Sequence, residues 1–327
     1  MRALFDVFFT CIKVGASCFT NRNKLANRSW RGEFIFRLAK SFLSRSIGKE
    51  FTWIRTRQKL LTLYSPDLLK VRSEKIFIAG VTCLRVQTKQ EANLSSTIIY
   101  FHGGGYAVGS ADGYHLMAAK IALKCQAKVI VVDYRLVPEF ALPTAQDDCY
   151  AVTQYVLADK THKVLLMGDS AGGALCLSML KRLKAAKQDE SLSRLAGCAL
   201  ISPWVAPLSY KNLSLENEAS DMLDRHITQY WVDTFYQSEA QGQEVDLSDI
   251  QSLGLAKKDW PPLYIQAAGA EVFLKQVQTL SDQLASMTIQ HEFEVFADQF
   301  HVFQTLSPIV PESNDALNKI AGFVRSV

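Results

Sequence analysis

A pentapeptide at residues 168–172, Gly-Asp-Ser-Ala-Gly, is the strongest chemical signal in this sequence of 327 residues. It follows a short apolar run at 164–167 and precedes an apolar stretch with helical spacing. A serine between strand and helix sits in a strained turn, so small residues must flank it two positions away. Its hydroxyl then projects at the positive end of the helix dipole. The pattern predicts that Ser170 is a nucleophile, and a glycine-rich turn is the alternative interpretation.

A second glycine-rich loop, His-Gly-Gly-Gly at residues 102–105, follows a run of strand-forming residues at 97–101. Acyl transfer through a serine needs N–H donors for the negative oxygen of the tetrahedral intermediate. Gly103, Gly104 and Gly105 offer such groups without a side chain in the way, and Ala171 adds the N–H next to the nucleophile. We therefore expect these four residues to form an oxyanion hole. A phosphate cradle is the alternative, but the Lys-Ser/Thr pair of a P-loop is missing.

The nucleophile also requires a base, which an acid must orient. If the chain order is nucleophile, acid, base, three histidines remain after Ser170, namely His226, His291 and His301. His226 lies in a polar segment, and His291 begins a strand of alternating pattern. His301 follows the carboxyl end of that strand, so we expect it to be the base.

Two carboxylates compete for the role of acid. Glu271 lies just beyond a predicted strand at 263–267, where an orienting acid is expected. Asp298 precedes His301 by only three residues, a spacing more typical of a turn. Position favours Glu271, with Asp298 as the alternative.

The elements that must hold these residues alternate along the chain from about residue 75. Strands are predicted at 75–79, 82–86, 97–101, 129–134, 164–167, 199–202, 263–267 and 293–296, and helices at 113–125, 144–158, 171–187, 271–287 and 314–326. Fully apolar strands between helices are typical of a parallel sheet covered on both faces. We expect a core at 75–203 and 261–327, a cap insertion at 204–260 with a helix near 224–237, and a basic helical region at 1–74 that joins the cap.

Further motifs occur in the order of a known family. They are Asp-Tyr-Arg-Leu-Val-Pro-Glu at 133–139, Pro-Pro-Leu-Tyr-Ile-Gln at 261–266 and Phe-His at 300–301. With the two glycine-rich motifs, the chain from about 75 to 327 resembles the hormone-sensitive-lipase-like family of α/β-hydrolases. The resemblance implies an α/β-hydrolase fold, with a mostly parallel central sheet, helices on both faces and a helical cap.

The same resemblance implies roles for single residues. Ser170 would be the nucleophile, His301 the general base and acid, and Glu271 the orienting acid, with Gly103 shaping the oxyanion loop. The family usually has Asp at the position of Glu271, and a second acidic residue at the position of Lys275. No metal or organic cofactor is implied.

These observations predict a serine carboxylesterase that acts on short- to medium-chain esters through an acyl-enzyme. Tyr106, Trp204 and Phe300 flank the motifs and are candidates for an apolar substrate pocket, with core packing as the alternative. An amidase or deacetylase of a small metabolite, or a lipase at a lipid surface, would use the same residues. A ligand-binding relative without catalysis would be expected to lack a triad residue, and none is missing.

The composition indicates the class of protein, and the distribution of charge indicates its possible partners. The chain is 48% hydrophobic and 21% charged, as expected for a globular enzyme. Its first 75 residues contain 16 Lys or Arg against five Asp or Glu. This surplus, with an amphipathic pattern at 30–47, predicts either packing on the main domain or peripheral membrane contact through residues 1–50. No nucleic-acid-binding motif is found.

The N-terminal sequence and the cysteines indicate the compartment. An apolar stretch at 3–20 is interrupted by Asp6 and Lys13, which argues against a membrane span or a signal peptide. The seven cysteines contain no Cys-x-x-Cys pair and are expected to be reduced and mostly buried. We expect a cytoplasmic protein that is attached to a membrane at most peripherally.

Overall fold

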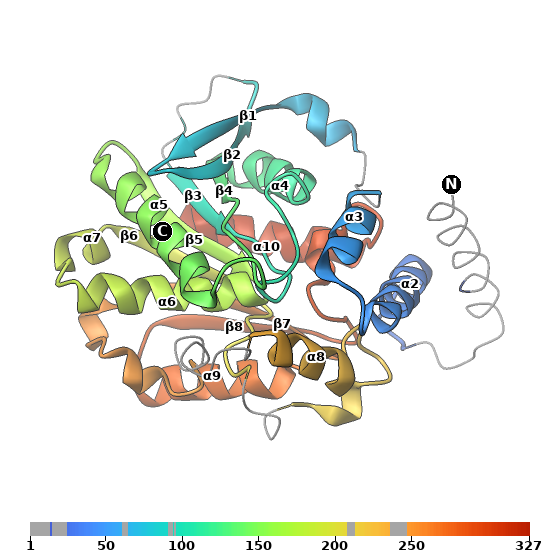
Figure 1. Cartoon of the computed structure of the whole chain (residues 1–327). Coiled ribbons are helices and arrows are strands. Elements are labelled where there is room, and N and C mark those ends of the chain that lie inside the picture. The colour runs from blue at the N-terminus through green and yellow to red at the C-terminus, as the bar shows by residue number, and fades with distance from the viewer. Residues whose placement is uncertain are drawn as a thin grey trace.

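The fold is built on one sheet of eight strands in the computed structural model, which describes residues 14, 25–60, 65–90, 94, 96–207, 213–235 and 247–327. The strand order is β1-β2-β4-β3-β5-β6-β7-β8 (Figure 1). The strands are β1 (Val71–Ile78), β2 (Val81–Thr88), β3 (Ser96–Phe101), β4 (Lys128–Val132), β5 (Lys163–Asp169), β6 (Leu195–Ile201), β7 (Leu263–Ala268) and β8 (His291–Phe296). Only the pairs β1–β2 and β2–β4 are antiparallel. The mostly parallel sheet predicted from the sequence is therefore confirmed.

Helices cover both faces of this sheet, as the apolar strands predict. They are α4 (His115–Cys125), α5 (Leu142–Ala158), α6 (Ala171–Ala185), α7 (Asp189–Ser193), α9 (Leu274–Ser286) and α10 (Glu312–Ser326). Successive side chains of a strand point to opposite faces. On β3, Ile98 and Tyr100 pack in one apolar cluster with α4 and α10, and Ile99 and Phe101 pack in another with α5, α6 and α9. Short 3₁₀ segments lie at Pro66–Lys70, Leu215–Asn217, Ile250–Leu253, Lys257–Asp259 and Phe303–Leu306.

The first two strands are longer than the sequence predicts. β1 begins at Val71 instead of residue 75, and most of its side chains are exposed. The first half of β1 is polar, with Arg72, Glu74 and Lys75 exposed, so a search for apolar runs finds only its second half. The turn between the strands has positive φ at both Ala79 (48°) and Gly80 (84°), as a two-residue hairpin turn requires.

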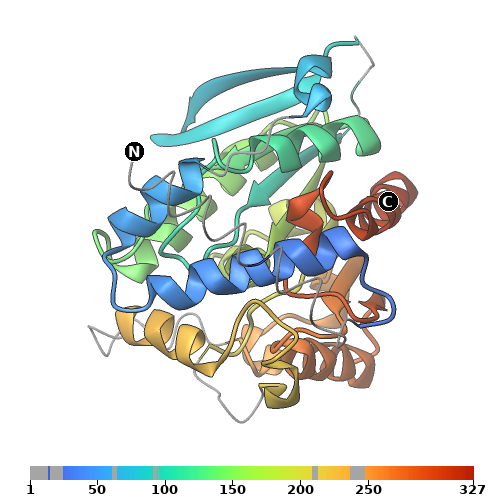
Figure 2. The same cartoon turned by 90° about the vertical axis from the view of Figure 1, so that its right-hand side faces the viewer.

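Three helices form a layer at the carboxyl ends of the strands, which we call the helical cap. They are α2 (Trp30–Ser46), α3 (Phe51–Leu60) and α8 (Arg225–Phe235). Figure 2 shows α2 crossing this side of the molecule, with α8 next to it. Phe51 joins the two parts of the cap, because its ring lies 5.7 Å from that of Tyr230 and 6.4 Å from that of Trp231. The helices expected at 30–47 and near 224–237 are present, whereas the four domain limits stay predictions.

Several sequence predictions concern residues outside the described part. Almost all of the apolar stretch at 3–20 lies there, as do Cys11 and Cys18. The five described cysteines are free and buried, in agreement with the prediction. No helix among the described residues is both long and apolar enough to span a bilayer.

Candidate active site

Ser170 occupies the sharp turn between β5 and α6. Its backbone has φ 53° and ψ −121°, a conformation that costs a non-glycine residue about 1–3 kcal/mol. The turn is tight enough to exclude side chains on both sides. A Cβ on Gly168 would lie 2.3 Å from the carbonyl oxygen of Gly172, and a Cβ on Gly172 would lie 1.9 Å from that of Phe101. The glycines of the motif are thus required by close backbone contacts, and Ser170 projects at the start of α6.

His301 and Glu271 complete a hydrogen-bonded chain with this serine. His301 Nε2 lies 2.9 Å from Ser170 Oγ, and His301 Nδ1 lies 2.7 Å from Glu271 Oε2. An ionised carboxylate only accepts hydrogen bonds. Nδ1 therefore carries the ring proton, and Nε2 is left to accept the hydroxyl proton of Ser170. The three residues are almost fully buried and come from loops that follow β5, β7 and β8.

The structure distinguishes the two candidate acids. Glu271 faces His301, and its second oxygen, Oε1, accepts the N–H of Ala268 at 2.9 Å. Asp298 is directed to the N-terminal segment, where its Oδ2 accepts the backbone N–H of Asn27 at 2.8 Å and its side-chain amide at 3.0 Å. Asp298 is therefore an anchor of the loop, and only Glu271 contacts the imidazole.

Three carboxylates determine the protonation of His301. Burial alone lowers its pKa, but the hydrogen bond to Glu271 and the charges of Glu271, Asp221 and Asp169 raise it by more. The pKa of His301 is therefore above the ordinary value of 6.5. A more basic imidazole accepts a proton from serine more readily, which suits a general base.

The loop at 102–105 lies against the elbow, but it does not present all of its N–H groups. Gly103 lies in the loop but does not offer its N–H, which donates to Asp169 Oδ1 at 3.0 Å and to the Tyr114 hydroxyl at 3.1 Å. These contacts fit the loop-shaping role that the resemblance implies, and not the role of a donor. Gly103 is thus excluded from the predicted oxyanion donors. Among the described residues, no acceptor is found for the N–H groups of Gly104 and Gly105. The φ of 111° at Gly104 suits glycine, and the φ of 52° at Gly105 favours it.

Buried aromatic residues fix the start of this loop. The Tyr134 hydroxyl donates to the carbonyl oxygen of His102 at 2.6 Å, and its ring stacks on the imidazole with centroids 4.2 Å apart. Burial lowers the pKa of His102, so this imidazole stays neutral. Asp169 accepts three hydrogen bonds, from Gly103, Tyr100 and Tyr114. Asp169, the residue before Ser170 in the serine motif, thus holds the loop at 102–105 in place. The motif allows any residue at this position, so the sequence pattern does not indicate this role.

The predicted pocket residues lie in different surroundings. Trp204 stacks on Phe273 with ring centroids 5.4 Å apart, and Phe273 meets the His301 ring edge-on at 4.9 Å. Trp204 is therefore separated from the imidazole of His301 by one ring, that of Phe273. Tyr106 is buried in the core cluster that contains α5 and α6.

Phe300 packs against Phe36 in a separate cluster below α2. It is thus a packing residue at the cap, not a residue placed next to the nucleophile.

One residue at the site was missed by the sequence analysis. Trp231 of α8 covers Gly105, since a Cβ on that glycine would lie 1.7 Å from the Trp231 ring. The cap thereby contacts the oxyanion loop directly. Only the amphipathic pattern of α8 hints at a buried face, and it does not identify the surface that the face meets.

No group of His, Cys, Asp or Glu side chains in the described ranges is arranged to hold a metal ion. The site consists of hydroxyl, imidazole, carboxylate and backbone N–H groups. Such a set can attack a carbonyl carbon, move a proton and hold an oxyanion.

Comparisons with known proteins identify the family and the fold. The carboxylesterase/phospholipase LipF of Mycobacterium tuberculosis is 28% identical over 235 residues, which cover 70% of this chain and 61% of LipF. The esterase EstE5, whose crystal was soaked with p-nitrophenyl butyrate, matches with a TM-score of 0.75 and 25% identity over 89% of this chain and 97% of EstE5. A hormone-sensitive lipase from a metagenome library shares the fold, with a TM-score of 0.75 and 24% identity over 88% of this chain and 96% of that one. The profile of a family with the α/β hydrolase fold matches residues 98–305, and the chain belongs to this family.

Proposed function

We propose that this protein is a serine carboxylesterase that forms an acyl-enzyme on Ser170. The observation that carries the proposal is the hydrogen-bonded chain from Ser170 through His301 to Glu271, with distances of 2.9 and 2.7 Å. The carboxylesterase and esterase names of LipF and EstE5 support it. No cofactor is required for the steps described below.

In the first step, Ser170 Oγ attacks the carbonyl carbon of the ester while His301 Nε2 takes the hydroxyl proton. The carbonyl oxygen becomes negative and accepts hydrogen bonds from the N–H groups of Gly104, Gly105 and Ala171. Removing one such donor typically costs about 10²–10³ in rate. The tetrahedral intermediate then collapses, the protonated His301 gives its proton to the leaving alkoxide, and an alcohol departs.

In the second step, water hydrolyses the ester bond to Ser170. His301 takes a proton from the water as its oxygen attacks the acyl carbon, and then returns a proton to Ser170 Oγ. The products are a carboxylic acid and the free enzyme. Glu271 keeps its negative charge throughout and stabilises the imidazolium of both steps.

The cap favours acyl chains of short to medium length. Ser170 is only 7% exposed, and Trp231 covers the loop that would bind the oxyanion. A butyryl group needs less room in such an enclosed site than a long acyl chain does. The p-nitrophenyl butyrate used with EstE5 is therefore a suitable first substrate.

Hydrolysis of p-nitrophenyl esters of graded acyl length tests the proposal. We expect the highest kcat/KM at short to medium chains, and a fall in kcat of about 10⁴–10⁶ for Ser170→Ala. Ser178→Ala is the matched control, since this buried serine lies on α6 and outside the hydrogen-bonded chain. Equal rates for wild type and Ser170→Ala would refute the proposal.

Two further substrates distinguish the alternatives that use the same residues. A p-nitroanilide of the preferred acyl group reports amide hydrolysis, and phospholipid vesicles report hydrolysis at a lipid surface. We expect the ester in solution to be preferred over both. A higher kcat/KM for the anilide would assign the site to an amidase, and a higher rate on vesicles would assign it to a lipase.

A further inference from the structure

A buried carboxylate outside the triad contacts the loops of both the acid and the base. Asp221 is fully buried and lies between β6 and α8. Its Oδ1 accepts the backbone N–H of His301 at 2.8 Å. Its Oδ2 accepts the backbone N–H of Val272 at 2.9 Å, directly after Glu271 in the chain. One side chain thus links the two loops whose relative position sets the distance between acid and base.

The segment that carries Asp221 makes further contacts with the loop of the acid. The N–H of Ser214 donates to the carbonyl oxygen of Val272 at 2.8 Å. The side-chain amide of Asn217 donates to the carbonyl oxygen of Glu271 at 2.9 Å. This segment was expected to belong to a cap insertion, yet it packs against the catalytic loops. These two hydrogen bonds therefore also fix the segment that carries Asp221 against the loop of Glu271.

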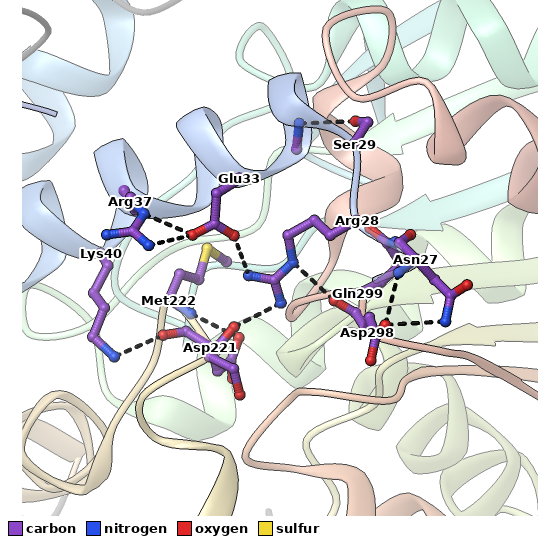
Figure 3. A network of polar contacts seen from close by, with 12 residues as sticks. Asn27, Arg28, Ser29, Glu33, Arg37, Lys40, Asp221, Met222, Asp298 and Gln299 are labelled. Carbon is purple, nitrogen blue, oxygen red and sulfur yellow. Dashed lines mark hydrogen bonds and ion pairs between the residues drawn. The ribbon is translucent and has the colours of Figure 1, made fainter. Parts of the chain in front are cut away.

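Two cationic side chains from the N-terminal part of the chain, Arg28 and Lys40, lie near Asp221 (Figure 3). Arg28 is 1% exposed, and it donates to the carbonyl oxygens of Ser220 and Asp298, both at 2.8 Å. Its third contact is an ion pair of 3.3 Å with Glu33 on α2. Lys40 of α2 donates to the carbonyl oxygen of Asp221 at 3.0 Å.

The charges facing Asp221 are those of Arg28, Lys40, Glu271 and, when protonated, His301. Burial raises the pKa of Asp221 to about 6, and the neighbouring His301 and the two N–H donors act in the opposite direction. Asp221 is accordingly ionised at neutral pH. Its negative charge faces the imidazole, whose pKa it helps to raise.

Resting on the proposed esterase function, we propose that Asp221 is a positioning residue for Glu271 and His301, and that Arg28 completes its site. Asp221 does not need to touch the substrate for this role. Its two hydrogen bonds fix the backbone of both loops, and its charge stabilises the imidazolium that forms when Ser170 loses its proton. The N-terminal segment is then part of the catalytic centre, because Arg28 joins the loops of Asp221 and His301.

The variant Asp221→Asn tests this role. Two oxygens of Asp221 accept backbone N–H groups, Oδ1 from His301 and Met222 and Oδ2 from Val272. An asparagine has only one acceptor oxygen, so at least one of these hydrogen bonds is lost together with the charge. We expect kcat for p-nitrophenyl butyrate to fall by up to about 10²-fold, the effect of a small misplacement of catalytic groups. KM should change little, and the midpoint of kcat/KM against pH should move to lower pH, because one charge that raises the pKa of His301 is gone. Glu216→Gln, an exposed carboxylate of the same segment, is the matched control.

A merely structural role predicts a different result. Thermal unfolding would then occur at lower temperature, and kcat/KM would fall by the same factor at every pH without a shift of the midpoint. That outcome, or wild-type kinetics of Asp221→Asn, would overturn the inference.

A second readout does not depend on ester turnover. The pKa of His301 can be measured by NMR with ¹³C-labelled histidine, assigned by comparison with His301→Asn. We expect a lower value in Asp221→Asn than in Glu216→Gln. If the wild type hydrolyses no ester, the proposed function fails, while this titration still tests the role of Asp221. Equal values in the two variants would overturn it.

The link to the N-terminal segment is tested by combining substitutions. If Arg28 acts through Asp221, the double variant Arg28→Met/Asp221→Asn should have nearly the kcat of Asp221→Asn, because groups in one network are not additive. Should Arg28→Met prove insoluble, Lys40→Met removes the half-buried second cation and enters the same comparison. If the fold-losses in kcat of the two single variants instead multiply in the double variant, Arg28 acts independently of Asp221. That result would refute the proposed link between the N-terminal segment and the catalytic loops.

Discussion

The assignment of the acid can be tested by changing one atom of Glu271. Both of its carboxylate oxygens accept hydrogen bonds, Oε2 from His301 Nδ1 at 2.7 Å and Oε1 from the N–H of Ala268 at 2.9 Å. A glutamine has one oxygen and one NH₂ group. If its oxygen faces His301, the NH₂ opposes the N–H of Ala268. If its oxygen faces Ala268, the NH₂ donates to Nδ1.

The second arrangement satisfies both neighbours but changes the tautomer of the imidazole. When Nδ1 accepts a hydrogen bond, the ring proton moves to Nε2, which can no longer accept the proton of Ser170. The wrong tautomer costs about 10⁴ in kcat where a triad acid is replaced by its amide. We therefore expect Glu271→Gln to lose kcat for p-nitrophenyl butyrate by about 10⁴, with KM little changed.

Asp298→Asn is the matched control, because it makes the same chemical change in the loop that carries His301. Asn27 supplies both of its side-chain contacts, and an asparagine at its φ of 62° is tolerated. We expect kcat within about threefold of wild type and a loss of stability of about 1 kcal/mol. Thermal unfolding of all proteins shows whether each variant is folded. A collapse of kcat in Asp298→Asn, with Glu271→Gln near wild type, would reverse the assignment.

Three further predictions concern the base and the oxyanion loop. The kcat/KM of the wild type should rise with pH to a midpoint above 6.5, because the pKa of His301 is raised and only the neutral imidazole accepts a proton; a midpoint below that value would contradict the reasoning. Gly105→Ala should lower kcat by about 10²–10³, because its Cβ would meet the Trp231 ring and the loop must move, and Trp231→Ala should recover part of the loss. Asp169→Asn should lose about 1–3 kcal/mol of stability and also kcat, because one of two buried acceptor oxygens, which together bind Gly103, Tyr100 and Tyr114, becomes an NH₂ group; unchanged thermal unfolding would refute this.

The strands and the catalytic turn could be predicted because their signals are local. The eight strands found by the sequence analysis all occur, and the helices expected at 113–125 and 144–158 differ by two residues at most. The elbow is recognisable because backbone atoms of Gly172 and Phe101 approach so closely that only one residue type fits. Chain order after Ser170 then left few candidates for the base. Such signals need no knowledge of contacts between distant residues.

The errors arise where a residue has a second contact that no motif describes. Gly103 looked like an oxyanion donor, but its N–H is used by Asp169, which the serine motif treats as a variable position. Asp221 belongs to no motif, and the hydrogen bond that it accepts from His301 crosses 80 residues of sequence. The bond from Arg28 to Asp298 crosses 270 residues. Neither contact has a spacing that a single sequence can reveal.

These contacts explain part of the excess of Lys and Arg over Asp and Glu in the N-terminal region. The candidate active site gathers Glu271, Asp221 and Asp169 in the interior, and buried negative charge needs compensation from nearby cations or hydrogen-bond donors. Arg28 and Lys40 supply cations next to Asp221.

Arg55 of α3 has a related role at the oxyanion loop. It donates to the carbonyl oxygens of Ala107 and Val137, both at 2.8 Å, and pairs with Glu139. These arginine and lysine side chains are engaged in hydrogen bonds and ion pairs within the protein. If the N-terminal region binds lipid as well, the attraction must come from its other basic residues. Substitutions confined to those residues should weaken binding to anionic vesicles and leave kcat for a soluble ester unchanged, whereas Arg28→Met should lower kcat whether or not vesicles are present.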